Sequence, residues 1–203
     1  MGRVLTGLVP DQPEVHGLVA LMEIQASRLR ARVGPGGEPV LLYAQNRRRW
    51  DQLLIQRGLA ALQQAERLGG TSGPYALQAA IAACHAIAPC AADTDWLRIA
   101  HLYQRLGQMT PSPVVALNRA VALAMADGPA VALAQVEELA AAGTLSGYYL
   151  LHATRGDLLM RLQRPAEAAD CFRTALRLAE SGAATDAERR FLARRLAESG
   201  ESA

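Results

Sequence analysis

Four prolines stand where helices can begin, and their spacing constrains the fold more than any other feature of the sequence. Proline is tolerated at the first helical position because its missing N–H would have no intrahelical partner there, and its fixed φ suits a helix. Pro74 and Pro113 are 39 positions apart, and Pro129 and Pro165 are 36 apart. Repeats of two helices have a period of ~34 residues, which longer loops extend. The prolines therefore predict helices that follow one another in pairs.

Residues 155–180 add small residues and one aromatic ring at helical spacing. Phe172 lies four positions and Ala175 seven positions after Ala168, so the three side chains share one helical face. Gly156, on the preceding helix, leaves space for a large ring. This arrangement resembles a tetratricopeptide repeat, in which small residues allow two helices to cross closely and a ring fills the gap beside them. We expect Phe172 to be buried between Gly156 and the neighbouring repeat.

The resemblance implies an all-α fold, a right-handed superhelix of stacked helix pairs with a capping helix at its C-terminal end. Thr185 and Glu188 have the spacing of a capping box, in which each side chain binds a free backbone N–H of the other residue. The capping helix is therefore expected to start at Thr185. The expected pairs before it are 74–88 with 93–108, 113–126 with 129–142, and 147–162 with 165–179.

The N-terminal third has helical spacing on both sides of a glycine-rich break. Apolar residues recur at helical intervals over 13–32 and again over 50–68. Between them, a Gly-Pro-Gly-Gly stretch at 34–37 breaks any helix, and 40–43 has the composition of a short extended segment or small hairpin. We expect one continuous stack made of an N-terminal helical unit with a loop at 33–49 (residues 1–70) and the three pairs with their capping helix (residues 71–203).

The composition favours an all-helical chain and excludes several functions. Alanine accounts for 40 of the 203 residues, while Phe and Trp occur twice each; alanine has the highest helix propensity and packs helices closely. All 21 basic residues are Arg. The absence of Lys excludes a phosphate-loop lysine and Schiff-base chemistry. A net charge of +2 is too small for a nucleic-acid-binding domain, so we expect no direct contact with nucleic acid.

The titratable residues form no catalytic or metal-binding pattern. The histidines have no partners at metal-ligand spacing, and the cysteines lack the paired spacing of zinc sites, so we expect structural histidines and reduced, buried thiols. Asp93 and Asp95 stand before a helix, where carboxylates cap free N–H groups. We therefore expect no enzyme activity, no cofactor and no metal. The histidines and cysteines concerned are His16, His85, His101, His152, Cys84, Cys90 and Cys171.

No segment of the chain predicts export or a membrane span. The N-terminus lacks a charged start followed by a long apolar run and a small-residue cleavage site. No apolar stretch of roughly 18 residues or more is free of charge. We expect a cytoplasmic protein without membrane contact.

Seven segments occur in an order that is typical of one known protein group. The most specific are PSPVVALNRAVALAM (111–125), DTDWLRIAHLYQRL (93–106) before it, and GYYLLHATRGDLL (147–159) after it. The other four are VPDQPEVHGLVALM (9–22), RRRWDQLLIQRGLAAL (47–62), GPYALQAAIAACHA (73–86) and ERRFLARRL (188–196). Together they resemble the C-terminal extension of a group of extracytoplasmic-function RNA polymerase sigma factors. There, a tetratricopeptide-like domain follows two regions that bind polymerase and read the promoter; neither region is in this sequence, so we expect a fragment of a longer protein.

The resemblance implies a regulatory or assembly module for transcription initiation, with the sigma regions in cis or the RNA polymerase core as its partner. Arg47, Arg48 and Arg49 in the loop are candidate contacts, and so is Arg119 on the first helix of the middle pair. Arg119 also has a structural alternative, an ion pair inside the stack. Two other functions stay open: a free-standing adaptor that binds a peptide or protein in a concave groove, and a small-ligand sensor or enzyme with a deep polar pocket.

Overall fold

A computed structural model describes residues 2–70, 72–182 and 184–200. The regular elements over these ranges are all helices, which confirms the predicted all-α class. The chain divides into two compact units, which we call unit 1 (residues up to 34, and 40–111) and unit 2 (35–39, and from 112 onward). In the described part, no helix is long and apolar enough to cross a membrane.

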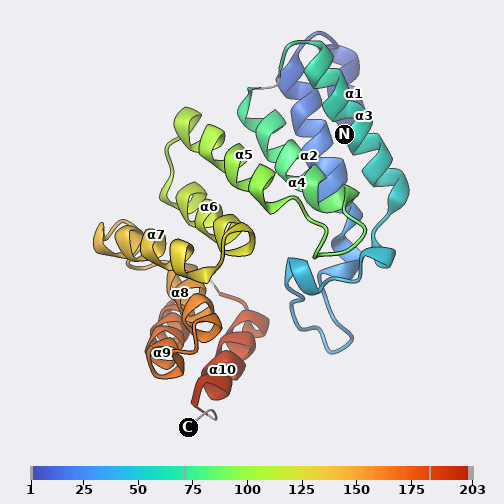
Figure 1. The fold of residues 1–203 in the computed structure, drawn as a ribbon. Helices are drawn as coiled ribbons and strands as arrows, with labels where there is room; N and C mark the ends of the chain where they lie inside the picture. Colours follow the sequence, from blue (N-terminus) through green and yellow to red (C-terminus); the bar gives the residue numbers. More distant parts are fainter. Residues whose placement is uncertain (1, 71, 183, 201–203) are drawn as a thin grey trace. The chain divides into compact units, whose positions relative to one another are not determined.

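Unit 1 is a bundle built around one central helix, α2 (Pro13–Ser27). Both α3 (Gln52–Arg67) and α4 (Pro74–Ile87) pack along α2, and α5 (Trp96–Met109) packs against α4 (Figure 1). These four helices lie where helical spacing predicts them, although α2 ends early and is followed by a 3-10 turn, η1 (Leu29–Ala31). The short helix α1 (Gly2–Leu8), which packs against α2, was not expected.

Small residues allow α2 and α4 to approach each other closely. A Cβ atom at Gly17 would lie 2.7 Å from the backbone N of Ala76 and 3.0 Å from its Cα. Ala20 and Ala79 are fully buried in the same core. Because backbone atoms limit the contact at Gly17, a larger residue there must push the two helices apart. The abundance of alanine thus has a direct structural role in this unit.

The N-terminus of α4 is capped by a side chain of α2. Gly73, the N-cap residue, offers no side-chain acceptor, and Pro74 follows it. The Glu14 carboxylate instead accepts hydrogen bonds from the backbone N–H groups of Tyr75 (2.9 Å) and Ala76 (3.2 Å). A carboxylate at this end satisfies free donors and interacts favourably with the helix dipole. The contact connects a residue before position 70 to residues after it. The boundary expected between 1–70 and 71–203 stays a prediction.

The segment between α2 and α3 is a loop, as expected, and of the residues at 40–43 that could have formed a short extended segment, Leu41 is extended while Leu42 begins a turn. This turn is a 3-10 turn, η2 (Leu42–Ala44), and a second one, η3 (Arg47–Arg49), precedes α3. Val40 N donates to Arg32 O (2.9 Å) at the base of the loop. The buried Gln45 side chain donates from Nε2 to Val40 O (3.0 Å). Turns and a side chain thus satisfy backbone groups that a strand would have paired.

Unit 2 follows the predicted order of helix pairs. Pro113, Pro129 and Pro165 lie in the first turn of their helices, as Pro74 does in α4. This confirms the prediction that these four prolines mark helix starts. Each helix packs against the next one along the chain, so α6 pairs with α7 and α8 with α9 (Figure 1). The elements are α6 (Pro113–Ala126), α7 (Pro129–Ala141), α8 (Tyr149–Arg161), α9 (Pro165–Ser181) and α10 (Asp186–Gly200).

Polar contacts at both ends hold α10 on the rest of unit 2. At its start, Thr185 N donates to Glu188 Oε2 (2.8 Å) and Glu188 N donates to Thr185 Oγ1 (3.3 Å), which is the predicted capping box. The Tyr149 hydroxyl of α8 donates to Glu188 Oε1 (2.9 Å). Near the end of the helix, Arg195 Nη2 donates to Asp157 Oδ1 of α8 (2.6 Å). The last helix is therefore tied to α8 as well as packed on α9.

Candidate functional site

Arg47, the first of the three loop arginines predicted to contact a partner, is bound within unit 1. Its Nη1 donates to the backbone oxygens of His85 and Ala88, at 2.9 Å for Ala88. Its Nη2 donates to Thr94 Oγ1 (2.9 Å), and its guanidinium lies 5.2 Å from the centroid of the Trp50 ring. The side chain therefore binds free carbonyl groups at the end of α4 and ties that end to two loops.

The His85 ring is buried beside this guanidinium. Its centroid lies 5.1 Å from that of Trp96 in an edge-to-face contact. The pKa of His85 is lowered to about 4, mainly because the ring is buried. The positive charges of Arg47 and Arg28 lower it further. Burial also lowers the pKa of Arg47 from its ordinary value. His85 is therefore neutral at neutral pH and fills a structural position.

Arg48 and Arg49 point their charges to solvent. Both residues are exposed on η3, and the Arg48 backbone N donates to Asn46 Oδ1 (3.0 Å), which starts the turn. Their guanidinium groups have no acceptor within the described chain. Of the loop arginines, these two keep their side chains available for a partner, and their role stays a prediction.

Arg119 lies half-buried on α6, in a depression of unit 2. Ala116, Gln135, Glu138 and Leu139 line the same depression, whose volume is about 540 Å³. Arg119 Nε is buried and has no acceptor among the described residues. The ion pair inside the stack, the structural alternative for this residue, is not formed with any described carboxylate. A contact between Arg119 and a partner stays a prediction.

The four residues named for repeat packing meet between α8 and α9. Phe172 is fully buried, and a Cβ at Gly156 would lie 2.8 Å from its Cε1 and Cζ atoms. Ala168 and Ala175 are fully buried on the same helix as Phe172. The guanidinium of Arg195 lies 5.3 Å from the centroid of the Phe172 ring. These side chains stabilise unit 2 and offer no surface to a partner.

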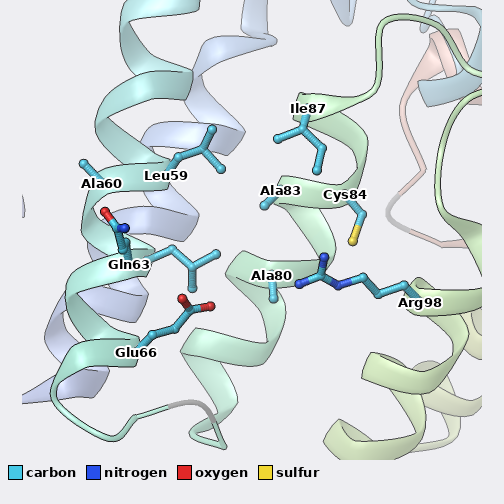
Figure 2. A pocket seen from close by; sticks show the side chains of 10 residues that line it. Leu59, Ala60, Gln63, Glu66, Ala80, Ala83, Cys84, Ile87 and Arg98 are labelled. Carbon is cyan, nitrogen blue, oxygen red and sulfur yellow. The ribbon is translucent and has the colours of Figure 1, made fainter.

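A groove between α3 and α4 is the candidate site that the sequence did not indicate. It exists because both helices pack against α2 and contact each other much less. Leu59 of α3 and Ala80, Ala83 and Ile87 of α4 form its apolar walls, as Figure 2 shows. Its volume is about 410 Å³, and Ile87 at its edge is 56 % exposed. Alanines keep this groove open where larger side chains would close it.

Charges of opposite sign flank the groove. Glu66 extends from α3 and Arg98 from α5, whose guanidinium reaches toward Ala80 (Figure 2). Both side chains are exposed, and neither has an ion-pair partner within the described residues. The groove thus presents one acid and one base with an apolar surface between them.

The Cys84 thiol lines the groove but is not an activated nucleophile. Burial raises its pKa above the ordinary value, although the nearby charge of Arg98 acts in the opposite direction. A thiol with a raised pKa stays protonated at neutral pH and reacts slowly. Across the described residues, no three His, Cys, Asp or Glu side chains gather to hold a metal ion. The groove therefore suits binding of apolar side chains better than bond-breaking chemistry.

Among the other titratable residues, Asp95, Cys84 and Cys171 follow the sequence expectations, whereas Cys90 does not, and His101, expected to be structural, is exposed on α5. Asp95 caps α5 by accepting from Arg98 N (2.9 Å), as predicted. Cys84 and Cys171 are buried, but Cys90 is exposed, and its thiol donates to Asp93 Oδ2 (3.0 Å). The expectation of a buried Cys90 was wrong because the residue lies in the loop after α4, beyond the helical pattern.

Two comparisons connect the chain to known sequences. Residues 1–66 match a family model described as a family of unknown function, DUF6596. The chain is also 48% identical over 179 residues to an uncharacterized protein of Rhizobium meliloti (strain 1021). That match covers 88% of this chain and 42% of the relative, so the chain spans less than half of the relative's length. No solved structure matches the chain.

Proposed function

We propose that this chain is a regulatory or assembly module of a sigma factor, which binds the sigma regions in cis or the RNA polymerase core during transcription initiation. The order of the seven sequence segments supports this function. The all-α structure agrees with the helical domain that the resemblance implies. In this proposal the helix pairs belong to a right-handed, tetratricopeptide-like superhelix, and the module is cytoplasmic, has no catalytic role and does not bind promoter DNA.

The open groove of unit 1 is the observation that most directly supports a protein partner. An amphipathic helix binds such a groove by placing its apolar face against the walls and its polar face toward solvent. Ile87 and Leu59 offer apolar contacts to a bound helix. The opposite charges of Glu66 and Arg98 can fix the position of that helix along the groove. We propose that a helix of the partner lies here, with a basic residue near Glu66 and an acidic residue near Arg98.

The length of the Rhizobium relative also supports the proposal. The matched region takes up 42% of that protein, which leaves room for polymerase-binding and promoter-reading regions outside the match. A helical module joined to such regions acts on them at a high effective concentration. Binding in cis therefore needs only modest intrinsic affinity.

Transcription in vitro tests the proposed function. The full-length protein is compared with a form that lacks this module, and the isolated module is used to pull down core polymerase and the sigma regions. We expect transcription to fall on deletion and the module to capture at least one of the two partners. Undiminished transcription together with no capture of either partner would overturn the proposal.

A pair of matched variants tests the groove itself. Ile87→Glu places a charge on the groove wall, whereas Leu53→Glu changes a residue on α3 with nearly the same exposure (56 % and 55 %) that does not line the groove. Both substitutions are expected to change stability by no more than about 0.5 kcal/mol. We expect only Ile87→Glu to lose partner capture; equal capture by both variants would remove the groove from the proposal.

A free-standing adaptor remains the alternative function, and the depression around Arg119 favours it. This depression lies on unit 2, whereas the groove lies on unit 1. Its Arg119 and Gln135 side chains offer hydrogen-bond donors to an acidic peptide. This function predicts capture of a peptide by unit 2 and no effect of the module on transcription. Loss of capture in Arg119→Gln, with capture retained in Ile87→Glu, would favour the adaptor over the sigma-factor module.

A further inference from the structure

Two arginines beyond the end of α2 converge on one neutral oxygen atom. Arg28 donates from Nε (3.1 Å) and Nη2 (2.6 Å) to Gln25 Oε1. Arg32 donates from Nη2 to the same oxygen (2.6 Å). All three residues are half-buried. Two guanidinium groups are thus held side by side by an amide that carries no charge.

No carboxylate of the described chain neutralises these two guanidinium groups. Burial, followed by the charge of Arg32, lowers the pKa of Arg28 to about 10, and the only opposing influence comes from Tyr103. Burial raises the pKa of Tyr103, so its phenol is neutral at neutral pH. His85, which feels the charges of Arg28 and Arg47, is also neutral there. The cluster therefore carries at least two positive charges without a negative one beside them.

The cluster also has N–H groups to offer. An amide oxygen accepts few hydrogen bonds at once, and three N–H donors already share Gln25 Oε1. Arg32 Nε is buried and has no acceptor among the described residues. Each guanidinium carries further N–H groups, and a buried donor or charge gains free energy when an anion pairs with it. The geometry favours an anion with more than one acceptor oxygen.

We propose that Arg28 and Arg32 bind a phosphate group, either free phosphate or the terminal phosphate of a small phosphomonoester. A phosphate dianion matches two adjacent guanidinium groups in charge, and its oxygens match their planar forks in geometry. A single carboxylate brings half of that charge. Gln25 holds the two arginines side by side through three of their N–H groups, and the remaining N–H groups stay available to the phosphate. This inference is independent of the proposed transcription function, since none of these residues lines the groove.

Titration with inorganic phosphate tests the site. Binding to the whole chain is followed by calorimetry and by thermal unfolding, with chloride added to keep the ionic strength constant. We expect saturable binding and a rise in Tm with phosphate. Arg28→Gln and Arg32→Gln should each weaken binding by roughly tenfold or more, since each removes a charge-assisted pair. Arg30→Gln, which removes an exposed charge from η1 between the two arginines, serves as the matched control and should bind like the parent.

A second variant keeps the test valid if the arginine variants fold poorly. Gln25→Glu places a carboxylate where the three N–H groups already converge, so it supplies an internal negative charge. We expect this variant to have a higher Tm than the parent in chloride alone and to lose the response to phosphate. A Gln25→Glu protein that is stable but still responds to phosphate like the parent would overturn the proposal.

The choice of anion separates a site from a general salt effect. Glycerol phosphate that binds as tightly as inorganic phosphate supports a terminal phosphate ester as the ligand, whereas binding of inorganic phosphate alone supports the free ion. Acetate should bind at least roughly tenfold more weakly than phosphate because of its lower charge. A response that does not saturate, that acetate reproduces, or that is equal in Arg28→Gln and Arg30→Gln would overturn the proposal.

Discussion

The two units of this chain differ in how often arginine pairs with a carboxylate. The ion pairs between described residues lie in unit 2, where Arg155, Arg164, Arg173, Arg189, Arg194 and Arg195 pair with Asp or Glu. In unit 1, Arg28 and Arg32 bind an amide oxygen, and Arg47 binds backbone oxygens and a hydroxyl group. The net charge of the chain conceals this difference.

Three acids of unit 1 bind helix ends instead of arginine side chains. Glu14, Asp51 and Asp95 accept hydrogen bonds from backbone N–H groups at the N-termini of α4, α3 and α5. A carboxylate in that position satisfies free N–H groups at the start of the helix. Arginine charges of unit 1 therefore remain available to an external anion, whereas carboxylates of unit 2 neutralise many of the arginine charges there.

The largest expected effect is on unit 2, from Phe172→Ala. The ring is fully buried against Gly156, so its removal should lower the free energy of unfolding by about 3–5 kcal/mol. Far-UV circular dichroism reports on all helices, whereas both tryptophans, Trp50 and Trp96, lie in unit 1. In urea, we expect the dichroism transition to shift strongly and the tryptophan fluorescence transition to shift little.

Phe191→Ala is the matched control, because Phe191 is the other phenylalanine of the chain and is only half-buried. We expect it to cost less than about 2 kcal/mol. Equal shifts of the fluorescence and dichroism transitions in Phe172→Ala would show that the two units unfold together. A cost below about 1 kcal/mol would contradict the packing described for Phe172.

The second prediction is that unit 1 loses stability in mild acid before unit 2 does. The pKa of His85 falls from 6.5 to about 4 on folding, so below pH 6.5 the unfolded chain takes up a proton that the folded chain does not. Stability is complete above pH 6.5 and falls as the pH drops toward 4, by an amount on the order of 3 kcal/mol. The urea midpoint of tryptophan fluorescence, measured between pH 4 and 8, should follow this course.

Two further measurements qualify that prediction. His85→Gln should flatten the pH profile even if it lowers stability overall, whereas His101→Gln, at an exposed position of α5, should leave the profile unchanged. In unit 2, the Thr185 backbone N–H lowers the pKa of Glu188. The Glu188 carboxylate therefore stabilises unit 2 at neutral pH, and this stabilisation is lost only as the pH falls below the ordinary range of a carboxyl group. A parallel loss in both units between pH 6.5 and 4 would contradict the assignment to His85.

The smallest effect concerns ionic strength. Surface ion pairs contribute about 0–1 kcal/mol each and weaken when salt screens them. Unit 2 should therefore lose on the order of 1 kcal/mol in high sodium chloride, while unit 1, whose arginines repel one another, should stay constant or gain stability. Dichroism and fluorescence transitions measured across a salt series distinguish these outcomes. Asp157→Asn, which removes one of the two carboxylate partners of Arg195, should reduce the salt response of unit 2, and an unchanged response would count against the comparison.

The helices of unit 2 were predictable from sequence because their signals are local. Pro113, Pro129 and Pro165 each fix the start of a helix through their own φ, and Thr185 with Glu188 forms the capping box before α10. These effects act within one turn of chain and need no knowledge of distant neighbours. The order of the helix pairs then follows from short loops.

The contacts of unit 1 were not predictable because their partners are far apart in sequence. Arg47 binds carbonyl oxygens that lie 38 and 41 positions away, and any residue can supply such an acceptor. The groove depends on how far apart α2 holds α3 and α4, which the alanines at 80 and 83 do not reveal in the sequence. The sequence also gives no sign that Arg28 and Arg32 share one acceptor, because Gln25, which brings them together, carries no charge.

The Glu14 cap on α4 has a consequence for the order in which the protein is made. The carboxylate precedes the Tyr75 N–H that it binds by 61 positions, so it has left the ribosome well before α4 is synthesised. Gly73 and Pro74 give α4 no cap of its own, and a short helix without tertiary contacts is marginal in water. The newly made α4 thus meets a preformed acceptor and a matching surface on α2, and this region can fold vectorially, from the N-terminus onward, as translation proceeds.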